Sequence, residues 1–193
     1  MKSRNWTVLI IGGASCVGKS SIAYEIANHY GISVLEFDDI YIALNTVVSA
    51  DKFPAICDIN GEDWENLGVE GNFNWLIDVG KEMSEALNKI VERHIEDDVP
   101  VIIEGDYIIP ELVKPLLSAK VKALFIQESD KTQIMSNNQS REGWSNSLSA
   151  DIYVYYNNWL QQSCKELGIN TLESRPWNNA LERAIASLKQ MEE

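Results

Sequence analysis

The chain has 193 residues, of which 45% are hydrophobic and 9% aromatic, a composition that is typical of a globular protein and argues against disorder. This length is most simply one domain, and we expect a single domain over residues 1–193. The formal net charge is −13 and Lys and Arg form no cluster, which argues against a nucleic-acid partner. No apolar run approaches the roughly 20 residues of a membrane span, and the N-terminus has no signal-peptide pattern. We therefore expect a cytoplasmic protein without a membrane partner.

The cysteines, Cys16, Cys57 and Cys164, are odd in number and widely spaced, and no C-x-x-C pair occurs. This pattern argues against both a disulfide framework and a zinc site. We expect the three thiols to be reduced.

The first predicted element is a strand over residues 7–11, an apolar run rich in β-branched residues. The motif G-x-x-x-x-G-K-S follows at residues 13–20, and residues 21–30 are predicted to form a helix that Gly31 ends. In this order of strand, loop and helix, backbone N–H groups and the positive end of the helix dipole point at a polyphosphate. The predicted nucleotide-binding residues are Gly13, Ala14, Ser15, Cys16, Val17, Gly18, Lys19, Ser20 and Ser21.

Two side chains of the motif have more specific predicted roles. Lys19 can reach the β- and γ-phosphates of a nucleoside triphosphate, which makes it a candidate catalytic residue. The hydroxyl of Ser20 is placed to ligate Mg²⁺. The alternative, a glycine-rich turn that binds nothing, is disfavoured by the flanking strand and helix.

A second strand is predicted over residues 32–37, and it runs directly into Asp38 and Asp39. Because ligands gather at the carboxyl ends of strands in open α/β sheets, this acidic pair should face the phosphate-binding motif. We favour Asp38 as the group that accepts the proton of a substrate hydroxyl, and Asp39 as a group at the Mg²⁺ site. The alternative is that one of them caps a helix beginning at Ile40.

The middle of the chain has two contrasting parts. Residues 41–75 are the least periodic, with Pro54, Gly61, Gly68 and Gly71 as interruptions, and we expect only short helical turns there. From about residue 73 to residue 95, apolar residues recur at helical spacing, which predicts one long amphipathic helix.

A continuous apolar run over residues 99–103 predicts a buried parallel strand that ends in Glu104, Gly105 and Asp106. Glu104 occupies the position at which a strand-end acid holds Mg²⁺, directly or through water. Asp106, two residues on, is the alternative for that role.

Beyond this strand we expect a short helix over residues 108–117, a strand over residues 121–126 and a polar segment over residues 128–150. The polar segment is predicted to be a mobile cover with one helix. Arg141 is its only Arg and could close over a transferring phosphate, the alternative being a solvated surface position.

The last predicted elements are a helix over residues 151–167, a weak strand over residues 169–172 and a terminal helix through Met191. Arg175 follows the strand, and we expect it to lie on a nucleotide base or near a phosphate. The alternative is a plain helix-entry turn with a buried Trp177. The alternation of strands and helices predicts a parallel sheet covered on both faces.

In order along the chain, the motif at residues 13–20, the strand end at residues 37–40, the strand at residues 101–105 and the turn at residues 175–177 resemble one known family. They are similar to the P-loop small-molecule kinases of the adenylate-kinase-like group, which includes nucleoside, shikimate, chloramphenicol and 2-phosphoglycerate kinases. The resemblance implies an α/β fold, the three-layer sandwich of P-loop NTPases with a five-stranded parallel sheet. It implies ATP as donor, Mg²⁺, and Asp38 as the residue that orients or deprotonates the acceptor hydroxyl. It also implies an acceptor-binding segment at about residues 41–75 and an Arg-bearing lid at about residues 128–149.

The charges of the presumed acceptor segment depart from that pattern. Members with anionic acceptors usually carry Arg there, whereas residues 41–75 hold a single cation, Lys52, and six carboxylates. Because an unpaired anionic group is costly to desolvate, we expect a small neutral or cationic acceptor that carries a hydroxyl. Trp64, Phe73 and Trp75 could form a flat wall for it, the alternative being core packing.

Two other functions stay open. One is a nucleotide-dependent switch or ATPase, although the guanine signature N-K-x-D does not occur. The other is a nucleotide-binding protein without transfer activity, to which the single Arg of the lid points. The sequence also leaves open whether the protein is a monomer or a homodimer.

Overall fold

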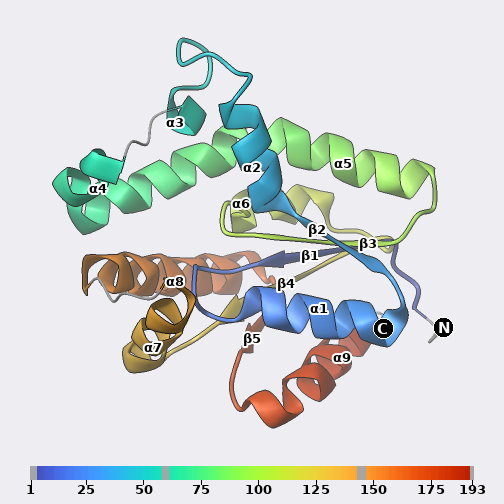
Figure 1. The fold of residues 1–193 in the computed structure, drawn as a ribbon. Coiled ribbons are helices and arrows are strands. Elements are labelled where there is room, and N and C mark those ends of the chain that lie inside the picture. Colours follow the sequence, from blue (N-terminus) through green and yellow to red (C-terminus); the bar gives the residue numbers. More distant parts are fainter. Residues whose placement is uncertain (1–3, 58–60, 143–146, 192–193) are drawn as a thin grey trace.

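The computed structural model describes residues 4–57, 61–142 and 147–191. Its centre is a sheet of five parallel strands in the order β2-β3-β1-β4-β5, which confirms the predicted α/β fold (Figure 1). The strands are β1 (Val8–Gly12), β2 (Ser33–Glu36), β3 (Val101–Gly105), β4 (Val121–Gln127) and β5 (Thr171–Glu173).

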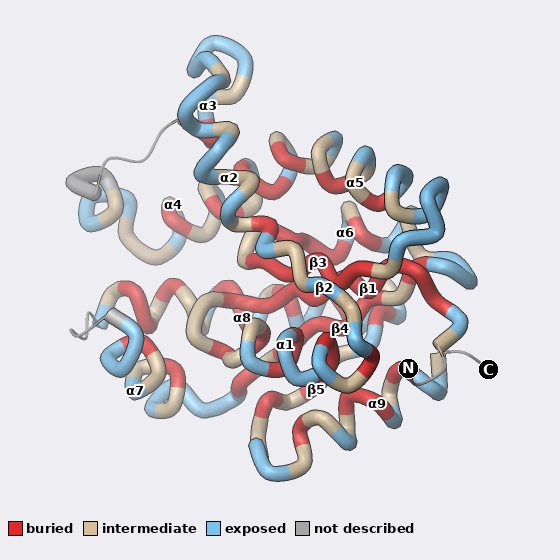
Figure 2. Tube along the Cα trace, turned by 45° about the vertical axis from the view of Figure 1, so that its right-hand side comes forward, coloured by how far each residue is buried: buried red, intermediate tan, exposed pale blue. Residues whose placement is uncertain are grey.

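The register of the sheet brings the predicted strand ends together. Val8 of β1 lies opposite Val101 of β3 and Val121 of β4, so the three central strands begin at one level. Every residue of β1 and β3 is buried, because helices cover both faces of a parallel sheet and leave no polar face. Figure 2 shows this buried layer running along the central strands.

Helices lie on the two faces as right-handed crossovers require (Figure 1). On one face, α1 (Lys19–Tyr30) packs against α9 (Ala180–Gln190). On the other are α5 (Ser84–Glu96), α6 (Pro110–Val113), which continues into the short η1 (Lys114–Leu116), and α8 (Ser147–Leu167). No helix in the described ranges is both long enough and apolar enough to cross a bilayer.

The prediction of mostly irregular chain over residues 41–75 is wrong. This part is largely helical, with α2 (Phe37–Asn45), α3 (Pro54–Cys57) and α4 (Gly61–Glu82). The glycines that suggested irregular chain are accommodated within α4, which is kinked at Gly68. At the kink, the Asn72 amide donates to the carbonyls of Trp64 and Gly68 at 2.7 Å each, so a buried side chain satisfies main-chain groups there.

The single long helix predicted over residues 73–95 is divided. α4 ends at Glu82 and α5 begins at Ser84, with the buried Met83 between them. The break lets α4 pack on α8 while α5 packs on β1, whereas one straight helix would continue in a single direction. The apolar residues recur at helical spacing across the break because both helices bury an apolar face.

The polar segment after β4 is less exposed than predicted. It forms α7 (Lys131–Glu142), and Glu128, Ile134 and Asn138 are buried within it. Its mobility was a prediction from composition, and residues 143–146 lie outside the described residues.

The last described residues lie on the side of the sheet where the strands begin. The short η2 (Trp177–Asn179) leads into α9, and beyond α9 the carbonyl of Met191 accepts a hydrogen bond from Lys122 Nζ at 2.7 Å. Lys122 is the second residue of β4, so this contact lies at the opposite edge from the loop that follows β1.

Candidate active site

The loop between β1 and α1 has the shape of an anion cradle. Gly18 is the N-cap of α1, has a φ of 96° and provides no side-chain capping bond, so the first N–H groups of the helix are available to a ligand. A Cβ at Gly18 would overlap the Trp177 indole, so glycine is needed here for both conformation and space. These features fit the polyphosphate of a nucleotide.

Lys19 is buried in the loop, with 4% of its surface exposed, and its ammonium forms an ion pair with Asp106. The second carboxylate oxygen of Asp106 accepts a hydrogen bond from the Ser15 hydroxyl. Burial alone would lower the pKa of Lys19, but the nearby carboxylates, Asp106 above all, outweigh it and raise the pKa. Lys19 therefore keeps its positive charge in the crevice.

Glu104 lies on β3 with 3% of its surface exposed, in register with Glu36 of β2. Burial raises its pKa, while Lys19 and a hydrogen bond from the Ser20 hydroxyl oppose that shift. Its Oε2 atom is buried and has no hydrogen-bond partner among the described residues. An orphaned carboxylate oxygen beside the Ser20 hydroxyl fits the predicted Mg²⁺ position.

The structure brings no three His, Cys, Asp or Glu side chains together as a metal cluster within its described residues. Mg²⁺ is usually held by one or two protein groups together with substrate phosphates and water. A cation at Ser20 and Glu104 would depend on the nucleotide for its remaining ligands.

Asp38 does not end β2 as expected, because β2 stops at Glu36 and Asp38 is the second residue of α2. Its Oδ1 atom nevertheless faces β3 and accepts a hydrogen bond from the Asp106 N–H at 3.0 Å. The approach requires Gly105, where a Cβ would lie 2.8 Å from that oxygen. Burial first, and then the charge of Asp106, raise the pKa of Asp38 to about 7, against the opposing effect of Lys19. Such a value suits a general base near neutral pH.

These groups line a crevice of about 530 Å³. Most of the predicted site residues line it, and one of these, Asp39, is exposed. The lining residues are Cys16, Gly18, Lys19, Ser20, Ser21, Glu36, Asp38, Asp39, Ile42, Glu104, Asn137, Arg141 and Trp177.

Helix α7, which lies in the predicted lid, contacts the phosphate loop through two asparagines. Asn137 Nδ2 donates to the Cys16 carbonyl at 2.8 Å, and the Cys16 thiol lies 3.7 Å from Asn138 Oδ1. Arg141, one turn further along α7, is exposed and lines the crevice, and its role over a transferring phosphate stays a prediction. No feature of the sequence indicated Asn137, since one Asn in a polar helix looks like any other.

Arg175 has a different environment from the crevice. It forms a two-pronged ion pair with Glu128, at 2.6 Å from Nε to Oε2 and 2.8 Å from Nη2 to Oε1, and also reaches Gln133. Its role at the nucleotide stays a prediction. Trp177, expected to be buried if this were a plain turn, is 40% exposed and lines the crevice instead.

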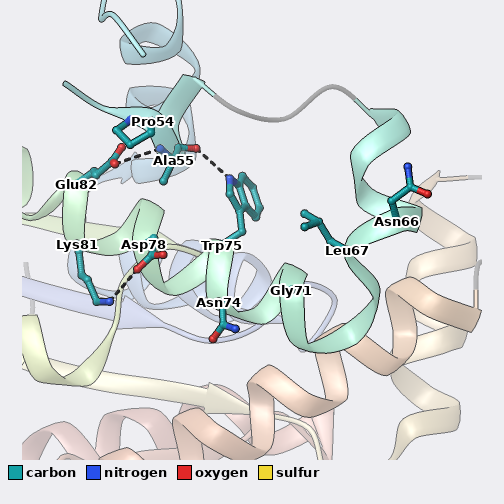
Figure 3. Close-up of a pocket in the computed structure, with 10 residues that line it drawn as sticks. All are labelled: Pro54, Ala55, Asn66, Leu67, Gly71, Asn74, Trp75, Asp78, Lys81 and Glu82. Carbon is teal, nitrogen blue, oxygen red and sulfur yellow. Dashed lines mark hydrogen bonds and ion pairs between the residues drawn. The ribbon is translucent and has the colours of Figure 1, made fainter. Parts of the chain in front are cut away.

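A larger groove of about 880 Å³ lies on the outer side of α4, beneath α3 (Figure 3). Trp75 stands in it and donates from Nε1 to the Ala55 carbonyl at 2.9 Å, while Glu82 accepts from the N–H groups of Ala55 and Ile56 at 3.1 and 2.9 Å. The groove is larger than the crevice, but the carboxylates of Asp38 and Glu104, whose pKa values are raised, line the crevice. The crevice is therefore the better candidate for the site of the reaction.

Aromatic rings pack between α4, α2 and the residues that follow β3. Trp75 packs edge-to-face on Tyr41, one turn after Asp38, and on Tyr107, which follows Asp106. Trp64 also contacts Trp75, while Phe73 packs against the rings of α8. Of the predicted wall, only Trp75 is among the residues that line the groove, while Trp64 packs against Trp75 and Phe73 packs against α8.

No family model matches the chain. By sequence it is similar to 2-phosphoglycerate kinase of Methanocaldococcus jannaschii, with 27% identity over 196 aligned positions that cover 92% of this chain and 62% of that protein. The chain thus spans about three fifths of the length of that relative.

By structure it is similar to shikimate kinase from Acinetobacter baumannii, with a TM-score of 0.61, 13% identity and coverage of 96% of this chain and 93% of that one. A gluconokinase from Sinorhizobium meliloti 1021 gives a TM-score of 0.54, 13% identity and coverage of 99% and 95%. At these identities the structural likeness shows the fold. Sequence and fold together confirm the resemblance to P-loop small-molecule kinases.

Proposed function

We propose that this protein is a kinase that transfers the γ-phosphoryl group of ATP to a hydroxyl of a small metabolite. One observation carries the proposal: Asp106 joins the buried Lys19 of the phosphate loop and the carboxylate of Asp38, which has a raised pKa, in one crevice. Phosphoryl transfer needs a cation that binds the phosphates and a base that accepts the proton of the attacking hydroxyl, and Lys19 and Asp38 could supply both. The names of the sequence relatives support the same reaction class.

In this proposal the acceptor oxygen bonds to the γ-phosphorus, the bond from that phosphorus to the β,γ-bridging oxygen breaks, and ADP leaves. Asp38 takes the proton of the acceptor hydroxyl. Lys19 and Arg141 neutralise the charge of the transferring group, with Lys19 buried and Arg141 approaching from α7. Ser20 and Glu104, with Asp39 through water, would hold Mg²⁺, which supplies charge neutralisation at the phosphates.

The acceptor in this proposal is neutral or cationic. Lys52 is the only cation of residues 41–75 and is exposed, whereas the carboxylates of Glu36, Asp38 and Asp39 line the crevice. An acceptor phosphate would meet like charges there, which disfavours binding. Residues 41–75 hold the acceptor and residues 128–149 form the lid in this account.

A second candidate acceptor comes from the comparisons. The relatives are named 2-phosphoglycerate kinases, and that compound carries a phosphate and a carboxylate. The 27% identity over most of this chain favours the same acceptor, while the charges of the crevice oppose it.

The test is ADP release by the purified protein with Mg-ATP and a panel of acceptors. The panel contains nucleosides, sugar alcohols, an aminoglycoside, 2-phosphoglycerate and nucleoside monophosphates. We expect a neutral or cationic compound to give the highest kcat/KM. If 2-phosphoglycerate is best, the kinase stands and the acceptor class is wrong. If ADP forms without dependence on any acceptor, the protein is an ATPase.

A further inference from the structure

Asp106 contacts three parts of the site at once. Its carboxylate binds Lys19 and Ser15 of the phosphate loop, its N–H donates to Asp38 of α2, and its carbonyl accepts from the Tyr156 hydroxyl of α8 at 2.9 Å. The two main-chain bonds fix the residue from both sides. The carboxylate therefore presents a fixed pair of oxygens to the loop.

These oxygens contact the groups that the loop would offer to a nucleotide. Lys19 is the buried cation of the loop, and Ser15 is one of its variable positions. A carboxylate is planar and a phosphate is tetrahedral, but both are anions whose oxygens accept hydrogen bonds from the same donors. Asp106 therefore offers the loop an anion of the kind that a phosphate would supply.

We propose that Asp106 is an internal counter-ion that holds Lys19 in the nucleotide-free protein and is exchanged for a phosphate when a nucleotide binds. This inference rests on the proposed function only in that the loop binds a nucleotide. Asp106 competes with the incoming phosphate, so the protein binds nucleotides more weakly than the loop alone would.

The partners differ in their freedom to move. Lys19 carries its ammonium on a flexible four-carbon stem, whereas Asp106 is short and is held by main-chain bonds to α2 and α8. Lys19 is the partner that moves in the exchange, and a buried ammonium needs an anion at both ends of that movement. Phosphate provides it at one end and Asp106 at the other.

The test is the affinity of Asp106→Asn for ADP without Mg²⁺, measured by calorimetry. Asn keeps the size and the main-chain bonds but removes the charge that retains Lys19. Since a hydrogen bond to a charged group is among the strongest single polar contacts, we expect ADP to bind about tenfold more tightly. Asp106→Glu restores the charge and should return the affinity toward that of the parent protein.

Glu36→Gln is the matched control. Glu36 also lines the crevice, but its carboxylate accepts from the Tyr24 hydroxyl, and it has no assigned role in nucleotide binding or in the transfer step. The Gln variant removes one negative charge from the crevice, as Asp106→Asn does, but leaves the ion pair between Lys19 and Asp106 in place. We expect less than about a twofold change in ADP affinity, because exposed charges are screened.

Equal or weaker ADP binding by Asp106→Asn, or an equal gain in Glu36→Gln, overturns the proposal. If Asp106→Asn does not fold, the parent protein decides the question in a crystal structure with ADP. Lys19 should then bind a phosphate oxygen and no longer Asp106, and a retained pair with Asp106 overturns the exchange. Because binding is the readout, a protein that binds ADP but phosphorylates no acceptor refutes the proposed function alone.

Discussion

Asp38 combines a helical position with a contact to the neighbouring strand. It lies in the first turn of α2, and its carboxylate accepts from the N–H of Asp106 beyond β3. The sequence placed it near the phosphate loop because it follows a strand, and that reasoning holds although β2 ends two residues earlier. What the sequence could not provide is the burial that raises its pKa, since burial depends on how α2 packs on β3.

Replacing Asp38 by Asn tests the proposed base. Asn retains an oxygen for the Asp106 N–H but cannot take a proton from a hydroxyl. We expect kcat to fall by about 10² or more while the affinity for ATP stays within a fewfold, because a general base contributes 10² to 10⁴. Steady-state kinetics together with calorimetry would separate the two effects, and an unchanged kcat contradicts the assignment.

The pKa of Asp38 also predicts a dependence of stability on pH. The folded-state pKa is about 7 and the ordinary value is 3.8, so between these values the folded protein keeps a proton that the unfolded chain has lost. Stability therefore falls as pH rises through this window.

Asp38→Asn removes this effect. We expect the variant to be more stable than the parent at pH 8 by about 1 kcal/mol or more, and nearly equal at pH 4. Thermal unfolding of both proteins at the two pH values is the measurement. A variant that is less stable at pH 8 would show that the ionised carboxylate stabilises the fold.

Two neighbouring acids show a limit of sequence reasoning at this scale. Glu104 and Asp106 are two residues apart at the end of a strand, so their side chains point to the same side and pattern alone cannot separate them. The structure separates them by partners: Asp106 binds Lys19, and Glu104 lies beside Ser20. The motif residues Lys19 and Ser20 were predictable because their roles depend on local backbone shape.

At the scale of elements, strands and the first helix were predictable within two residues, because continuous apolar runs and a glycine cap define them. Residues 41–75 were not. Their helices carry glycines at positions where a side chain of the same helix satisfies main-chain groups, as Asn72 does at the kink of α4. Such compensation is visible only after folding.

The short helix α3 depends on another element for its N-terminus. Glu82 at the end of α4 accepts from the N–H groups of Ala55 and Ile56, as an N-cap residue would. Trp75, which like Glu82 belongs to α4, donates a hydrogen bond to the carbonyl of Ala55. If residues 41–75 hold the acceptor, this attachment shapes its binding site.

We therefore expect Glu82→Ala to raise the KM for the acceptor about tenfold and to leave the KM for ATP unchanged, since a lost cap weakens local order by about 1 kcal/mol. Asp78→Ala is the control, because Asp78 lines the same groove but pairs only with Lys81, and both side chains are more than half exposed. Equal effects of the two variants on acceptor KM would show that α3 has no part in acceptor binding.

At the scale of the whole molecule, Arg175 and Glu128 connect the end of β4 to the turn after β5. Glu128 is 2% exposed and also accepts from the Ser174 hydroxyl. Burial tends to raise the pKa of Glu128, but the bonds from Arg175 and its neighbours outweigh this and lower it. The sequence showed Arg175 near the end of a strand but could not show that Glu128, 47 positions earlier, would be its partner.

Replacing Arg175 by Met leaves Glu128 buried without its counter-ion. We expect the free energy of unfolding to fall by about 3 kcal/mol or more in denaturant titrations. Arg93→Ala, which breaks an exposed pair with Asp97, should change it by less than about 1 kcal/mol.

The same Arg175 variant tests the prediction that this residue contacts the nucleotide. ADP affinity that falls at a temperature where the variant is still folded supports that contact. Unchanged affinity with lowered stability assigns Arg175 to the fold alone.

The hydrogen bond from Lys122 to Met191 has a practical consequence. It places the end of the last helix at the edge of the sheet where the strands begin, away from the phosphate loop and its crevice. A surface tether attached near this edge should leave the crevice open to a nucleotide, which suits binding measurements on immobilised protein.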